Sequence, residues 1–106
     1  MKLWVDDLRP KPDDYDKWAK TTDEAITFLS NGDITHVSFD HDLGDLIEDK
    51  EEKTGYDIAL WVEENAFFKR IPPFTYTIHS ANPVGARNIK QAMSNAERYW
   101  ENNEST

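Results

Sequence analysis

Short apolar segments that end abruptly in polar clusters are the feature that most constrains this chain. Three such junctions occur: residues 3–5 before Asp6-Asp7, residues 36–39 before Asp40-His41-Asp42, and residues 74–78 before His79-Ser80. Brief runs of this kind, rich in β-branched and aromatic residues, are typical of buried strands. Helical patterns lie between them, and this alternation predicts an α/β fold with a parallel sheet covered on both faces. Since ligands bind outside the carboxyl ends of such strands, the clusters predict a site at that edge.

Capping signals predict three helices. They are expected over residues 21–31, where Thr21 and Glu24 fit a capping box, over residues 57–67, and from Pro83 onward with Asn82 as the N-cap. Within each segment the apolar residues recur at helical spacing, which gives every helix one face to bury.

Two segments are expected to lack regular structure. Pro10 and Pro12 forbid a regular helix or a central strand, so a loop should precede a short strand within residues 15–20. The stretch from Asp45 to Lys53 is densely charged and should be a mobile surface loop beside the site, with a short surface helix as the alternative.

The length and composition fit one folded domain. With 106 residues and a hydrophobic share of 38%, the chain is expected to form a single domain over residues 1–101, followed by a frayed tail at 102–106. No apolar run approaches the roughly 20 residues of a membrane-spanning helix, and the N-terminus does not resemble a signal peptide. A cytoplasmic protein without membrane contact is therefore expected. The absence of cysteine excludes disulfides, thiol catalysis and thiolate metal sites.

The charge balance restricts the partners. There are 21 acidic and 12 basic residues, so the formal net charge is −9. A field of this sign repels duplex DNA, whose binding depends on phosphate neutralisation by Lys and Arg. A small nucleotide or a single-stranded RNA end, held in a local pocket, remains compatible with it. Nothing in the sequence fixes the oligomeric state.

The strand-end carboxylates are candidate metal ligands. If Asp6, Asp7, Asp40 and Asp42 converge, their repulsion must be relieved by raised pKa values, by a cation, or by both, and Asp6, Asp7 and Asp40 are the candidate ligands. Mg²⁺ or another hard divalent ion suits such an oxygen-only group. The alternatives are that the carboxylates cap helices, pair with Arg9, or orient nearby histidines.

Two histidines lie at the same predicted edge. His41 and His79 have side chains whose ordinary pKa suits proton transfer at neutral pH, so they are candidates for an acid and a base acting on one phosphate. Asp40 or Asp42 would fix the tautomer of one of them. His36 opens its strand at the opposite edge, and a structural role is expected for it.

The segment after His79 is a candidate anion site. The first turn of the helix that starts at Pro83 offers backbone N–H groups and a favourable dipole to a phosphate. The residues expected to contact the phosphate are Arg9, Ser80, Asn82, Gly85 and Arg87. Arg87 opposes the dipole at this end of the helix, so a bound anion would account for it, although a plain surface arginine is the alternative.

With these residues in view, the chain resembles the cyclic-phosphate processing receiver domain family. The resemblance is carried by four segments in the expected order: Val5-Asp6-Asp7-Leu8-Arg9-Pro10, Ser38-Phe39-Asp40-His41-Asp42-Leu43-Gly44, Gly55-Tyr56-Asp57, and Ile78-His79-Ser80-Ala81-Asn82-Pro83-Val84-Gly85. It implies a receiver-like, flavodoxin-like three-layer sandwich with four mainly parallel strands in the order 2-1-3-4. The usual first helix and fifth strand would be missing. In the related response-regulator receivers, the positions of Asp6-Asp7 bind Mg²⁺, that of Asp40 accepts phosphate, and that of Ser80 carries Ser or Thr.

The resemblance implies hydrolysis of cyclic phosphates on nucleotides or RNA ends. The histidines at 41 and 79, together with the absence of the receiver lysine, favour direct chemistry on a phosphate ester over phosphorelay. The alternative is a non-catalytic degenerate receiver that binds a nucleotide messenger or a protein. An acidic inhibitor acting through its surface is a third hypothesis, which the resemblance does not support.

Overall fold

The fold is built on a four-stranded sheet with all its strands parallel. The structure is a computed structural model that describes residues 1–41 and 54–104. Its elements are, in chain order, β1 (Lys2–Val5), β2 (Lys17–Ala19), α1 (Thr22–Ser30), β3 (His36–Phe39), α2 (Gly55–Phe67), β4 (Thr75–Ile78) and α3 (Pro83–Glu104). The strand order is β2-β1-β3-β4. The expected α/β class, strand order and receiver-like topology are thus confirmed. Asp42 and the charged stretch Asp45–Lys53 lie outside the described residues, and the fraying of the tail stays a prediction.

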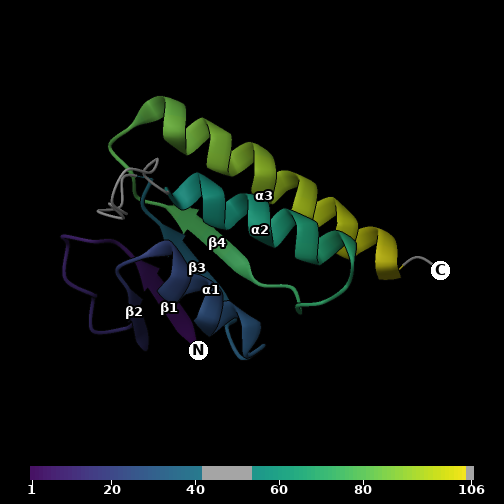
Figure 1. Ribbon diagram of the computed structural model, residues 1–106, viewed down its shortest axis with the longest axis horizontal. Helices are drawn as coiled ribbons and strands as arrows, with labels where there is room; N and C mark the ends of the chain where they lie inside the picture. Colours follow the sequence, from purple (N-terminus) through teal and green to yellow (C-terminus); the bar gives the residue numbers. More distant parts are fainter. Residues whose placement is uncertain (42–53, 105–106) are drawn as a thin grey trace.

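All three helices pack on one face of the sheet. Leu3 and Val5 of β1 and Val37 and Phe39 of β3 are fully buried, and they belong to one apolar cluster with residues of α1, α2 and α3. Helix α2 contacts both α1 and α3, and α2 and α3 run side by side in Figure 1. The structure thus differs from the expected three-layer sandwich. Its physical reason is the connection from β1 to β2, where Pro10 and Pro12 leave a loop in place of a helix on the second face.

The second face of the sheet, which we call the open face, carries no helix in the described part of the chain. Strand alternation and register place on it the side chains of Lys2, Trp4, Trp18, His36, Ser38, Thr75 and Thr77. The loop after β1 lies against part of this face, since the Tyr15 ring meets the Trp4 ring edge-on at a centroid distance of 5.2 Å. Trp4 Nε1 also donates to the carbonyl of Arg9 at 3.0 Å. Two tryptophan-anchored turns therefore replace a helix, because Trp18 Nε1 donates in the same way to the carbonyl of Asp6.

Capping residues start the helices next to the strand ends. The Thr21 hydroxyl accepts from the Glu24 amide, as the capping box predicts. Helix α2 begins at Gly55, two residues before the expected start, because Thr54 and Asp57 form a second capping box that the sequence analysis missed. The strands of Figure 1 point toward the side where α2 and α3 begin, so these helix starts and the strand ends share one edge. None of the helices in residues 1–41 and 54–104 is long and apolar enough to cross a membrane.

Gly55 fixes how closely α2 approaches this edge. Its amide donates to the carbonyl of His41 at 2.8 Å, and a Cβ at position 55 would lie 1.9 Å from the carbonyl oxygen of Asp40. That oxygen belongs to the backbone, so it cannot rotate away. A side chain here would push α2 off the end of β3.

Gly55→Ala should therefore lower the free energy of unfolding by about 1–3 kcal/mol, the usual cost of overpacking. The measurement is urea denaturation followed by circular dichroism. Asn88→Ala is the control, because Asn88 is exposed on α3 and should stay within about 0.5 kcal/mol of the parent. Equal stability of the two variants would contradict the close approach.

Candidate functional site

Parallel register brings three polar side chains together at the carboxyl ends of the central strands. Val5, Phe39 and Ile78 are register partners, so the residues that follow them are level. The backbone pairing continues past the strands, with Asp40 N donating to Val5 O at 3.0 Å and His79 N to Phe39 O at 2.9 Å. As a result Asp6, Asp40 and His79 each offer a ligand atom within 4.8 Å of the others.

Asp6 is the buried centre of this group. Its side chain is only 1% exposed, and both of its oxygens have hydrogen-bond partners. Oδ1 accepts from the amides of Leu8 and Arg9, both at 2.8 Å, and Oδ2 lies 2.9 Å from Nε2 of His79. Burying a carboxylate is costly unless it is hydrogen-bonded, and these contacts supply the compensation. Asp6 therefore ties the turn after β1 to the end of β4.

The His79 ring is held by three side chains, and its backbone by a fourth. It stacks on the Trp4 indole at a centroid distance of 4.0 Å with the planes 5° apart, which fixes the plane of the imidazole. In that plane Nε2 meets Asp6, and Nδ1 lies 2.7 Å from Oγ of Ser38, a residue that is 2% exposed. Arg9 Nη1 donates to the backbone carbonyl of His79 at 3.0 Å. The ring is thus fixed in orientation before any ligand binds.

His41 lies on the other side of the edge, against the start of α3. A Cβ on Gly85 would fall 2.2–2.7 Å from atoms of the His41 ring, so Gly85 leaves the space that the imidazole fills. Asn82 Oδ1 accepts from the Gly85 amide at 2.9 Å, which turns the side-chain nitrogen of Asn82 toward Nδ1 of His41 at 3.4 Å. Since that nitrogen is a donor, Nδ1 of His41 is the ring atom that carries a lone pair.

The predicted anion residues occupy the same edge, with their polar groups only partly available. Asn82 caps α3 as expected, and its amide donates to Ser80 Oγ at 3.1 Å. The cap occupies the Gly85 amide, and Pro83 has no N–H, so most of the first turn is satisfied internally. Arg87 is exposed, and no described residue pairs with it. Contact of Arg9, Ser80, Asn82, Gly85 and Arg87 with a phosphate stays a prediction.

The donor set of the Asp6, Asp40 and His79 group is compatible with a divalent ion in one tautomer only. Two ligands at about 2.1 Å on perpendicular bonds lie about 3 Å apart, close to the observed 2.9 Å between Asp6 and His79. Binding requires a lone pair on Nε2, with the Nδ1 proton given to Ser38 as an outer-shell partner. Asp7, expected as a ligand, is half-buried and not a member of this group. A nitrogen ligand suits Mn²⁺ or Zn²⁺ better than Mg²⁺.

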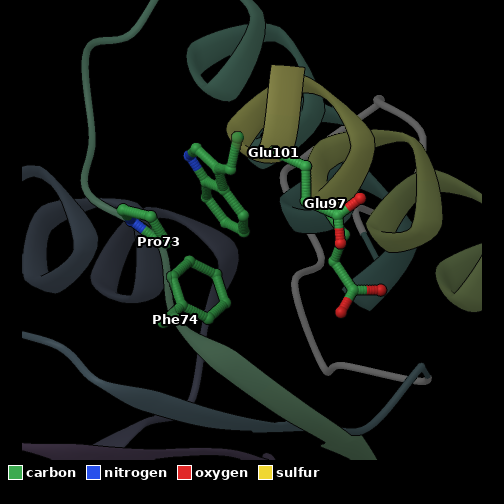
Figure 2. Close-up of a pocket in the computed structure, with 5 residues that line it drawn as sticks. Pro73, Phe74, Glu97 and Glu101 are labelled. Carbon is green, nitrogen blue, oxygen red and sulfur yellow. The ribbon is translucent and has the colours of Figure 1, made fainter. Parts of the chain in front are cut away.

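A hollow lies near the other end of the sheet (Figure 2). Pro73 and Phe74, just before β4, and Glu97, Trp100 and Glu101 near the end of α3 line it. Its volume of about 180 Å³ is below the roughly 300 Å³ of the smallest usual ligand pockets, and it holds no histidine. The strand ends therefore remain the candidate site.

The sequence analysis missed three residues that shape this site. Trp4, Ser38 and Thr77 each lie two positions before a recognised site residue, so strand alternation places them on the same face. Applying that rule to Asp6, Asp40 and His79 would have found all three. The apolar appearance of the strands concealed them.

The fold and the strand-end cluster together define a receiver-like α/β domain. The family model described as "Cyclic-phosphate processing Receiver domain" matches residues 1–95. The chain belongs to this family, as its sequence segments indicated. Comparison with curated proteins and with solved structures found no match.

Replacing Asp6 tests its structural part. Asp6→Ala would leave two backbone amides and the His79 ring without their acceptor, so the free energy of unfolding should fall by about 2–4 kcal/mol. Asp6→Asn keeps an acceptor for the two amides and should cost less. Denaturant titration measures both, and Asp7→Ala is the control, expected within about 0.5 kcal/mol of the parent. An Asp6→Ala protein as stable as the control would remove the carboxylate from this role.

Proposed function

We propose that this protein is a phosphoesterase that opens a cyclic phosphate on a nucleotide or an RNA end. The observation that supports it most directly is the Asp6–His79 pair beside Asp40, at an edge that also holds His41. The family match supports the substrate class. The imidazoles of His41 and His79 have different hydrogen-bond partners and lie at the same edge of the sheet. This arrangement suits a reaction that needs a base and an acid at once.

His79 is assigned as the proton donor. Thr77 donates its hydroxyl hydrogen to Ser38 Oγ at 2.9 Å, so the hydrogen of Ser38 is left for Nδ1 of His79. The proton of the neutral ring is then on Nε2, where Asp6 accepts it. A leaving oxygen that approaches this position would receive a proton already held in place.

His41 is assigned as the base, because its Nδ1 carries the lone pair and faces the start of α3. In the proposed step, a water oxygen attacks the phosphorus and gives a proton to Nδ1 of His41. The bond from phosphorus to one ring oxygen breaks, and that oxygen takes the Nε2 proton of His79, whose Nδ1 gains a proton in turn so that the ring stays neutral. The product is a phosphate monoester with a free hydroxyl.

Cations must hold the substrate against the negative field of the protein. Arg9 already lies at the end of β4, and Arg87 is exposed on the first turns of α3. In this proposal both pair with phosphate oxygens, and Ser80 and Asn82 contribute further polar groups. A divalent ion held by Asp6, Asp40 and His79 would supply Lewis-acid stabilisation of the phosphate in place of proton donation by His79.

A second function is favoured by one observation. Both ring nitrogens of His79 are already partnered within the protein, as expected if the histidine stabilises a receiver that binds a nucleotide without turning it over. A panel of candidate substrates separates the two functions, because an enzyme consumes its ligand and a binding module retains it.

The test is a panel of cyclic mononucleotides and cyclic-phosphate-ended oligonucleotides, each with EDTA, Mg²⁺ or Mn²⁺. Turnover in EDTA is expected, with a loss of rate at low pH, because His41 must be neutral to act as the base. His79→Gln should lower kcat by about 10²–10⁴-fold; glutamine is chosen because alanine would leave Asp6 unpaired. Tight binding with no turnover under any condition would select the binding module.

Arg87→Ala tests the phosphate contact separately. It should raise KM with little change in kcat, since its part is charge attraction to the bound phosphate. Lys90→Ala is the control, because Lys90 is an exposed cation one turn further along α3. Equal kinetic effects of the two variants would show that only the general field of the protein matters.

A further inference from the structure

A continuous row of polar side chains crosses the open face from His79 toward the far end of the sheet. Ser38 and Thr77 are register partners on β3 and β4, and His36 begins β3. The contacts are 2.7 Å from His79 Nδ1 to Ser38 Oγ, 2.9 Å from Ser38 Oγ to Thr77 Oγ1, and 3.4 Å from Thr77 Oγ1 to His36 Nε2. Two side chains, Ser38 and Thr77, therefore join the two imidazoles through three contacts, and no backbone group intervenes.

The hydrogen bonds in this row have a defined direction. Thr77 donates to Ser38, and Ser38 is left to donate to His79, as argued above. At the far end Thr75 donates to the carbonyl of Thr35 at 3.3 Å, so its oxygen accepts from Nδ1 of His36 at 2.7 Å. A second proton on His36 must then occupy Nε2, from which it donates to Thr77. Protonated His36 thus aligns every hydroxyl toward His79.

Because Ser38 is buried against His79, its hydroxyl is the group through which a proton can reach Nδ1 of the ring. Ser38 is 2% exposed and covers Nδ1 of His79, whose other nitrogen faces buried Asp6. A neutral imidazole that gives up its Nε2 proton must gain one on Nδ1 to avoid becoming an anion. Within the described part of the structure, the Ser38 hydroxyl is the group in contact with Nδ1.

We propose that His36, Thr77 and Ser38 form a proton relay that supplies Nδ1 of His79 as the Nε2 proton leaves. In the balanced step, His36 gives its Nε2 proton to Thr77, Thr77 gives its own to Ser38, and Ser38 gives its own to His79. His36 becomes neutral, and His79 remains neutral with its proton moved from Nε2 to Nδ1. The delivery of that Nε2 proton to a leaving oxygen rests on the proposed function, whereas the coupling of the two rings does not.

The surroundings of His36 suit a residue that releases its proton readily. Partial burial lowers the pKa of His36, and the positive charge of Lys2 on β1 lowers it further. The negative charge of Asp14, in the loop between β1 and β2, raises this pKa. The Tyr15 ring lies 6.0 Å away, and β4 presents only the hydroxyls of Thr75 and Thr77. The pKa of His36 therefore lies below the ordinary histidine value of 6.5, so the ring becomes protonated only at lower pH.

The test uses ¹⁵N spectra of the histidine rings in the full chain, recorded against pH with EDTA present. The His79 nitrogens should show the Nε2–H tautomer and a shift whose midpoint coincides with the titration of His36. Thr77→Val and His36→Gln should remove that shift, and Thr77→Ser should restore it, because serine keeps the hydroxyl. A shift that persists in Thr77→Val, or that is absent from the parent protein, would overturn the relay.

Kinetics provide a second readout wherever turnover is found. Thr77→Val should lower kcat about tenfold and Thr77→Ser should leave it near the parent value, since a hydroxyl and not a shape is required. Equal rates in the two variants would refute proton supply through Thr77. The spectra do not depend on turnover. If the protein hydrolyses no cyclic phosphate, the proposed function is wrong, and the coupling of His36 to His79 is still decided by the spectra.

Discussion

The buried carboxylate of Asp6 is the interaction on which the site depends. It accepts from two amides of the following turn and faces the ring of His79, so one side chain joins the end of β1 to the end of β4 across β3. An unpaired carboxylate in this position would cost several kcal/mol. The turn that carries Arg9 and the ring of His79 are therefore stabilised by the same group. Structure and chemistry cannot be separated at Asp6, which is why conservative replacements are the informative ones.

Among the residues that the structure describes, no helix covers the open face, and this leaves the sheet free to carry polar side chains there. Because residues 10–12 cannot form the usual first helix, the sheet can carry hydroxyls and imidazoles where a three-layer fold would require apolar side chains. Two tryptophans occupy the space in place of a helix, and one of them stacks on His79. The missing first helix and the row of polar side chains thus belong to the same face of the sheet.

Most of the fold could be predicted from the sequence because its signals are local. The capping box at Thr21, the Asn82-Pro83 helix start and the abrupt ends of the strands each depend on a few neighbouring residues. The number of layers could not be predicted, because it depends on which face of the sheet the missing first helix would have covered. The members of the site were also predicted, but their pairing was not. Asp6 was expected beside Asp7 as a metal ligand, whereas register places it against His79, which is 73 positions away.

His36 shows why a local reading of a histidine can mislead. It lies at the amino end of β3, far along the strand from the candidate site, so its position predicts a structural role. Parallel pairing of β3 with β4 nevertheless puts a hydroxyl at each alternate position between it and His79. A strand rises by about 3.3 Å per residue, so the level pair Ser38 and Thr77 lies two positions, about 7 Å along the strands, from each histidine. The regular spacing of a sheet can therefore connect two histidines at opposite ends of adjacent strands, provided that one face is free to be polar.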